Sequence, residues 1–164
     1  MNTLVESNAA SNLLPKIYVD ADACPVKQEV CKVARRRGLN VILVSNARMR
    51  VTDPDVARLV VVPGEFDAAD DWIVAQLAAG DIVITADIPL ASRCVKCGAR
   101  VLSPTGHEWN DANVGQALAT RDLLAGLRDA GAMLGGPPPF QPRDRSRFLQ
   151  NLDQIIQDRR RNGA

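Results

Sequence analysis

The stretch "KIYVDADACPVKQEV" at residues 16–30 joins a short apolar run to two closely spaced carboxylates and then to a helical pattern. Three apolar residues lead directly into Asp20, and Asp22 follows after a single alanine. Pro25 stands where a helix can begin, because proline is tolerated in the first helical turn. The stretch therefore predicts a buried strand that ends in acidic residues and leads into a helix. Two anions so close together repel each other unless a positive charge lies between them.

The same alternation of apolar strand and amphipathic helix continues along the chain. The predicted strands are residues 16–20, 40–45, 58–63, 81–87 and 99–104. The predicted helices are residues 26–37, 66–80, 88–98, 112–131 and 143–160. Because the strands are continuous apolar runs that alternate with helices, we predict a single-domain, Rossmann-like α/β fold. Such a fold has a mostly parallel sheet with helices on both faces.

Length and composition fit one globular domain. The chain has 164 residues, of which 46% are hydrophobic, and this length suits one domain with a sizeable core. We expect a flexible tail at residues 1–15, the domain at residues 16–158 and a basic tail at residues 159–164. No apolar run approaches the ~20 residues that a membrane span needs, and the N-terminus does not resemble a signal peptide. We therefore expect a cytoplasmic protein without a membrane partner.

The charges are unevenly distributed. Residues 27–50 carry seven basic residues and one acidic residue, and residues 143–161 carry six basic and three acidic residues. Between them, residues 53–111 carry ten acidic and four basic residues. An acidic centre with basic flanks is typical of a cation site beside a surface that binds a polyanion. Alternatively, the basic run at residues 35–37 only ends a helix, where cations complement the helix dipole.

Acidic residues follow three of the predicted strands. Because ligands bind beyond the carboxyl ends of parallel strands, we expect these residues to share one edge of the sheet. Oxygen ligands favour Mg²⁺ or Mn²⁺ over zinc. The predicted metal ligands are Asp20, Asp22, Asp70, Asp71 and Asp87, of which all but Asp22 are also predicted to be catalytic. The alternative for Asp22 and Asp87 is helix capping, and for Asp70 and Asp71 it is an interaction with the helix dipole.

The four cysteines do not predict a zinc site. Cys94 and Cys97 form one C-x-x-C pair, but Cys24, Cys31 and the single histidine, His107, supply no second pair of ligands. We interpret the cysteines as small hydrophobic residues and expect no zinc.

Three arginines near the C-terminus are candidates for binding phosphate groups. Arg143, Arg145 and Arg147 alternate in "PRDRSRF", Ser45 ends one predicted strand, and Thr105 follows another. All five are candidate contacts to nucleic acid. The alternative is structural: Asp144 or Ser146 caps the last helix, Phe148 docks it, and the arginines face water. The apolar face of that helix can pair two copies into a homodimer or dock within the chain, and the sequence does not choose between them.

Several long motifs give the chain a family resemblance. "YVDADACPVK", "DAADDWIV", "DIVITADIPLASR", "GARVLSPTG" and "GGPPPFQPRDRSRFLQNLD" resemble the YaiI/YqxD family of bacterial proteins. This family is similar in design to the PIN-like nuclease superfamily. The resemblance implies a PIN-like fold and a metal-dependent ribonuclease that uses Mg²⁺ or Mn²⁺. It implies ligand roles for Asp20, Asp70, Asp71 and Asp87, while Asp22 belongs to the family motif.

Two other functions remain open. A phosphatase of the haloacid dehalogenase type also has a strand that ends in D-x-D, with the first aspartate as nucleophile. Here, however, Ala23, Cys24 and Pro25 follow where that family has Thr or Val and usually Gly. A non-catalytic module that binds nucleic acid would need only the arginines.

Overall fold

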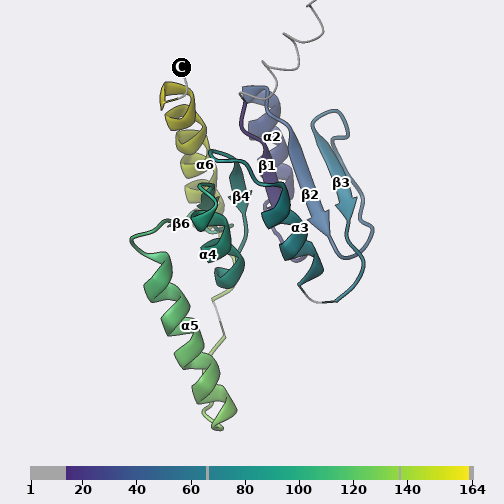
Figure 1. Ribbon diagram of the computed structural model, residues 1–164. Helices are drawn as coiled ribbons and strands as arrows, with labels where there is room; N and C mark the ends of the chain where they lie inside the picture. Colours follow the sequence, from purple (N-terminus) through teal and green to yellow (C-terminus); the bar gives the residue numbers. More distant parts are fainter. Residues whose placement is uncertain (1–13, 66, 137, 163–164) are drawn as a thin grey trace, which may run out of the picture.

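The protein is described by a computed structural model that covers residues 14–65, 67–136 and 138–162 (Figure 1). The predicted alternation of strands and helices is confirmed. The strands are β1 (Ile17–Asp20), β2 (Val41–Ser45), β3 (Ala57–Val61), β4 (Ile82–Ile84), β5 (Arg100–Leu102) and β6 (Glu108–Trp109). The helices are α2 (Lys27–Arg37), α3 (Ala68–Gln76), α4 (Ile88–Lys96), α5 (Val114–Asp129) and α6 (Pro142–Asn162). Most of the tail predicted at residues 1–15 lies outside the described residues.

These strands form one sheet in the order β3-β2-β1-β4-β5-β6. Neighbouring strands are parallel except for β5 and β6, which are antiparallel. The chain moves outward from β1 to β3 on one side and from β4 to β6 on the other, so the order reverses between β1 and β4. In open α/β sheets such a switch point leaves a crevice beyond the carboxyl ends of the two strands. The mostly parallel, Rossmann-like sheet that the sequence predicts is therefore confirmed, and its switch point lies at Asp20.

Helices cover both faces of the sheet, as predicted (Figure 1). Successive side chains of a strand point to opposite faces. Ile17 and Val19 of β1 accordingly pack in one hydrophobic core with α2 and α6. Tyr18 packs in a second core with α3 and α4. The two cores hold β1 and β4 in place, and the loops that follow these strands lie between them at the sheet edge.

The end of α2 explains part of the first basic cluster. Gly38 closes the helix in the left-handed conformation, with φ of 71°, which favours glycine. Arg35 pairs with Asp53, and Arg37 donates to both carboxylate oxygens of Asp153 at 2.9 and 2.8 Å. All three arginines of residues 35–37 stand in the last turn of α2, so the structural alternative for this run is confirmed.

The last helix docks within the chain. Phe148, Leu152, Ile155 and Ile156 of α6 are at most 2% exposed and belong to the core around β1. The helix continues through Asn162, beyond the end of the domain that we placed after residue 158. Of the two roles considered for its apolar face, the structure has intramolecular docking.

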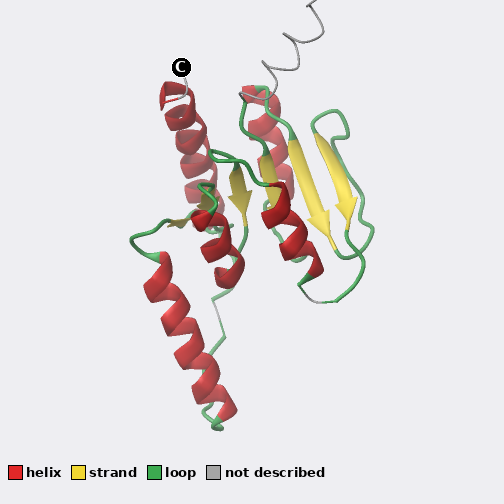
Figure 2. Cartoon of the chain, in the orientation of Figure 1, coloured by secondary structure: helices red, strands yellow, loops and turns green. Residues whose placement is uncertain are grey.

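Helix α5 projects from the body of the protein (Figure 2). Val114 is its buried residue, whereas Leu123, Leu124 and Leu127 are exposed. The two-residue strand β6, which the sequence analysis did not predict, leads into this helix.

Within the described ranges, no helix has the length and apolarity that crossing a bilayer would require.

Candidate functional site

One buried hydroxyl joins two of the predicted acids at the switch point. Val19 of β1 lies beside Ile84 of β4, so Asp20 and Thr85 follow at adjacent positions. Thr85 is 1% exposed, and its hydroxyl donates to Asp20 Oδ2 at 2.9 Å. Its oxygen accepts the Asp87 backbone N–H at 3.0 Å. Thr85 therefore fixes the Asp20 carboxylate and the start of the loop that carries Asp87.

Asp87 has the capping role considered for it and also lies near two other predicted acids. Its Oδ1 accepts the Leu90 backbone N–H at 3.0 Å, so Asp87 caps α4, with Pro89 in the first turn. It also lies close enough to Asp20 and Asp70 for its charge to raise the pKa of both carboxyls. Capping and membership of the acidic cluster are compatible because a carboxylate has two oxygens and several lone pairs.

Asp70 joins this cluster from the first turn of α3. Partial burial, followed by repulsion from Asp87, Asp20 and Asp67, raises the pKa of Asp70 from 3.8 to about 6, although Arg93 opposes the shift. Burial is likewise the largest cause that raises the pKa of Asp20. The hydrogen bond from Thr85 lowers this pKa, and the charges of Asp87 and Asp22 raise it further. We call Asp20, Asp70 and Asp87 the acidic cluster. Its negative charges are crowded in a partly desolvated space, which is the condition that a bound cation relieves.

Asp71 lies at the rim and not in the acidic cluster. Consecutive residues of a helix point about 100° apart, and the Asp71 side chain is 65% exposed. Its Oδ1 accepts from Arg93 Nη1 at 2.8 Å. The structure therefore separates two neighbouring acids that the sequence analysis treated alike.

Asp22 supports the loop after β2. Its Oδ1 accepts from the Ser45 hydroxyl at 2.7 Å and its Oδ2 accepts the Asn46 backbone N–H at 3.0 Å. The alternative that Asp22 caps the next helix is wrong, because Val26 occupies the N-cap position of α2. Ser45 is fully buried, and its Oγ accepts the Ala47 backbone N–H at 3.1 Å. The fixed hydroxyl therefore holds Asp22 in place.

The other predicted contacts to nucleic acid lie around the same edge. Thr105 is exposed, and its Oγ1 is 2.9 Å from Ser103 Oγ. Arg145 pairs with Glu29 of α2 at 3.3 Å, and its guanidinium carbon lies 5.4 Å from the centre of the Phe140 ring. Arg143 is exposed at the start of α6.

The structural alternative for this segment is also present. Asp144 Oδ2 accepts the Gln141 backbone N–H at 2.9 Å at the start of α6, and Arg147 lies 3.6 Å from Asp144. Because the arginine side chains are about half exposed, this capping leaves them open to solvent.

Of the C-x-x-C pair, Cys94 has the properties of a packing element, whereas Cys97 is exposed, contrary to the interpretation of all four cysteines as small hydrophobic residues. Cys94 is fully buried, and burial, with repulsion from Cys97 as the next cause, raises its pKa to about 12. A thiol that stays protonated at neutral pH is a poor nucleophile and metal ligand. The interpretation of Cys94 as a small hydrophobic residue fits this environment.

Thr85 and Lys27 are site residues that the sequence analysis missed. The signal for Thr85 was present, since D-A-D begins at the last residue of β1 and T-A-D directly follows the neighbouring β4. Lys27 extends its ammonium toward the Ala21 carbonyl at 3.4 Å. It lies in the first turn of α2, where periodicity alone does not distinguish it from a solvent-facing residue.

The loop between Asp22 and Cys24 is strained. Ala23 has φ of 59°, in the left-handed region, which costs a non-glycine residue about 1–2 kcal/mol. Such strain gathers at functional sites. Ala23→Gly should therefore raise the free energy of unfolding by about 0.5–1 kcal/mol, since strain relief exceeds the greater chain entropy of glycine.

Urea denaturation checks this expectation, and Ala119→Gly on the exposed part of α5 is the control. The control should lower the free energy of unfolding by about 1 kcal/mol, as glycine does within a helix. Equal losses in both variants would show that Ala23 is not strained.

The cluster has the donors of a magnesium site but not an assembled cage. Within residues 14–65, 67–136 and 138–162, no group of three or more Asp, Glu, His or Cys side chains could hold a metal ion as it stands. Mg²⁺, however, usually keeps several waters and binds through one or two carboxylates together with substrate phosphates. The carboxylates of the acidic cluster fit that mode of binding.

The strand order and the acids at the switch point define an α/β protein whose candidate site lies at the carboxyl edge of a parallel sheet. A family model described as "Uncharacterized BCR, YaiI/YqxD family" matches residues 18–158, and the chain belongs to this family. The family resemblance found in the sequence is thereby confirmed.

Bacterial relatives match most of the chain. A UPF0178 protein of Rhodopseudomonas palustris (strain BisB18) is 55% identical over 142 residues, which cover 86% of this chain and 91% of the relative. A UPF0178 protein of Nitrobacter winogradskyi is 54% identical over 147 residues, covering 89% and 93%. One from Agrobacterium fabrum is 54% identical over 141 residues, covering 86% and 92%.

Proposed function

We propose that this protein is a metal-dependent nuclease that hydrolyses phosphodiesters, with RNA as the preferred substrate. The observation that carries the proposal is the acidic cluster at the switch point, where the charge of Asp87 helps to raise the pKa of both Asp20 and Asp70. Crowded carboxylates lower stability unless a cation offsets their charge. Mg²⁺ or Mn²⁺ is the cation that oxygen ligands favour.

The chain's own residues would hold and orient the reacting groups. Asp20, Asp70 and Asp87 would bind the ion together with a phosphate oxygen of the substrate. Thr85 holds Asp20 at 2.9 Å, and Ser45 holds Asp22 at 2.7 Å, so both carboxylates at the end of β1 are oriented before substrate arrives. When bound, the metal would supply an activated water and stabilise the charge that develops at phosphorus.

Basic side chains around the same edge support a polyanionic substrate. Arg93 beside Asp71 and Arg143, Arg145 and Arg147 on α6 would contact phosphates that flank the scissile bond, with Thr105 as a further hydrogen-bond donor. The ion pair between Arg93 and Asp71 does not prevent this role, because exposed ion pairs are weak and exchange readily with a phosphate partner.

Calorimetry and a cleavage assay test the proposal together. Mn²⁺ should release or absorb saturable heat with the wild type, and the wild type should cleave labelled single-stranded RNA only when the ion is present. Asp20→Asn should lose at least about 100-fold in cleavage rate, more than the 10- to 100-fold loss typical of residues that only support a metal ligand. Asp55→Asn is the matched control, because its carboxylate is 86% exposed and precedes β3 at the opposite edge of the sheet.

The other functions predict different results. If the protein binds RNA saturably but neither cleaves it nor binds Mn²⁺, the nuclease proposal is overturned and a binding module remains. Turnover of a phosphomonoester with transient phosphorylation of Asp20 would favour the phosphatase. Equal cleavage by Asp20→Asn and wild type would remove Asp20 from the site.

A further inference from the structure

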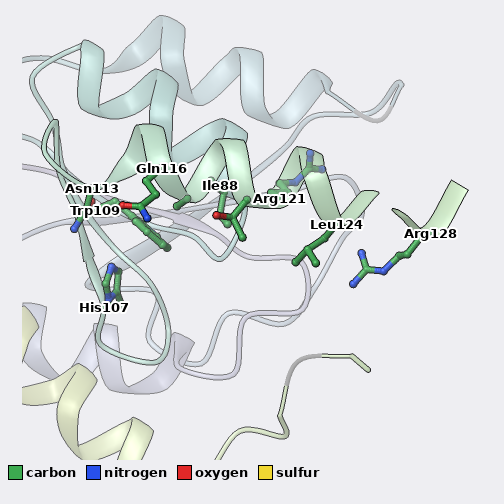
Figure 3. Close-up of a pocket in the computed structure, with 10 residues that line it drawn as sticks. Ile88, His107, Trp109, Asn113, Gln116, Arg121, Leu124 and Arg128 are labelled. Atoms are coloured by element: carbon green, nitrogen blue, oxygen red, sulfur yellow. The ribbon is translucent and has the colours of Figure 1, made fainter. Parts of the chain in front are cut away.

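A groove lies along α5, beside Ile88 and the segment that carries His107 and Trp109 (Figure 3). Its larger part, a cavity of about 490 Å³, is lined by Trp109 and Gln116 at one end and, farther along α5, by Leu124 and Arg128 at the other, and Ile88 lies between them (Figure 3). A second cavity of about 320 Å³ shares Ile88, His107 and Trp109 with the first. The shared residues make the two cavities neighbours, and together we call them the α5 groove.

The α5 groove begins beside the acidic cluster. Its smaller part is lined by Ala23, which follows Asp22, and by Ala86, which lies between Thr85 and Asp87. Ile88 follows Asp87 directly and borders both parts. A strand of nucleic acid with a phosphodiester at the cluster would therefore pass over Ile88 into the groove.

The lining of the groove is mostly apolar, with two aromatic rings at one end and a few polar and cationic groups along α5. The rings of His107 and Trp109 have their centres 4.2 Å apart and are tilted by 58°. Gln116 brings an amide, and Arg121 and Arg128 bring cations along α5. A nucleobase stacks on aromatic rings, its edge bonds amide groups, and its phosphate pairs with arginine.

The indole of Trp109 is held by packing and not by a hydrogen bond. Its Nε1 is buried and finds no acceptor in the part of the chain that the structure describes. An unsatisfied buried donor costs about 1–3 kcal/mol, and a buried tryptophan N–H usually has a partner. A ligand that carries an acceptor would therefore be favoured if the indole can shift to donate its Nε1–H to it.

We propose that the α5 groove binds single-stranded nucleic acid, with a base stacked on Trp109 and His107, the adjoining phosphate held by Arg121 and a phosphate farther along the strand held by Arg128. The position of this base next to the scissile phosphodiester rests on the proposed function, but base binding itself does not. The charge of the groove favours this occupant over an apolar peptide or a second copy of the chain, because two arginines in an apolar interface would have to be desolvated.

Fluorescence of Trp109 gives a direct readout. The chain has two tryptophans, so Trp72→Phe leaves Trp109 as the only indole. In this background and without divalent ions, an oligouridylate RNA should quench the emission saturably. Ribose 5-phosphate, which has no base, should not.

Two neighbouring leucines supply a matched pair of variants. Leu124 lines the groove and is 36% exposed, whereas Leu123 is 64% exposed and does not line it. Leu124→Glu places a negative charge beside Arg121 and Arg128 and should weaken binding of labelled RNA at least about tenfold, or about 1.4 kcal/mol. Leu123→Glu adds the same charge to the same helix and should change binding less than about twofold.

The outcomes separate this inference from the proposed function. Quenching by RNA in a wild type that never cleaves would support the groove and overturn the nuclease. Cleavage without quenching, with equal RNA affinity in the two glutamate variants, would overturn the groove and leave the nuclease standing. A dimer in sedimentation that both variants dissociate, with unchanged RNA binding, would assign the groove to a second copy and also overturn the inference.

Discussion

Phe148→Ala should lower the free energy of unfolding by about 3–5 kcal/mol, the cost of removing a large aromatic side chain from a packed core. Phe148 is fully buried between α6 and the core that contains β1 and α2. Its removal leaves a cavity under the strand that carries Asp20. Urea denaturation should show a lower midpoint with an unchanged slope, as expected when stability alone changes.

The same substitution should loosen one side of the candidate site. The loop that carries Thr105 and His107 rests on α6, since Asn151 bonds the Gly106 carbonyl at 2.6 Å. A Cβ at Gly106 would lie 2.8 Å from the Phe148 backbone nitrogen. Hydrogen exchange should therefore rise in residues 103–107 as well as in α6, because local opening follows lost packing.

Leu123→Ala is the control, because Leu123 is exposed on α5. A change within about 0.5 kcal/mol is expected for a surface substitution. If Phe148→Ala cost no more than this control, α6 would not be docked in solution as it is in the structure. A concentration-dependent loss of stability in Leu123→Ala would instead indicate that α5 pairs two copies.

The fold could be predicted because local and global signals agree. Continuous apolar runs mark β1, β2 and β4 as buried parallel strands, and Gly38 ends α2 as its position suggests. The two-residue β6 could not be predicted, since a strand of that length has no period to detect. It is nevertheless β6 that brings Trp109 to the α5 groove, so the strand that could not be predicted positions the proposed stacking residue.

The acids could be predicted as a group but not one by one. The rule that parallel strands end at one edge brings Asp20, Asp70 and Asp87 together without any knowledge of side-chain contacts. Whether Asp22 caps α2 or bonds Ser45 depends on a partner 23 residues away, which periodicity does not reveal. The same holds for Asp71, whose partner Arg93 lies on a different helix, 22 residues along the chain.

Asp70→Asn should raise stability at neutral pH, although it removes a residue proposed to be functional. The folded-state pKa of Asp70 is about 6, above its ordinary 3.8, so the folded state is penalised once the carboxyl ionises. The penalty is absent below about pH 4, grows between about pH 4 and 6, and is complete above about pH 6. A shift of about two units corresponds to about 3 kcal/mol, which solvent screening of this partly exposed group reduces to about 1–2 kcal/mol.

Urea denaturation of wild type and Asp70→Asn at several pH values measures this gain, which should appear near pH 7.5 and vanish near pH 4. Asp71→Asn is the matched control: it removes the neighbouring charge and its 2.8 Å contact with Arg93, and should give no gain at any pH. Mn²⁺ should stabilise the wild type more than Asp70→Asn, because an ion that binds only the folded state adds RT ln(1 + [Mn²⁺]/Kd) to the free energy of unfolding, and the variant binds it more weakly. A gain that persists at pH 4 would contradict the raised pKa, and equal stabilisation of both proteins by Mn²⁺ would remove Asp70 from the proposed metal site.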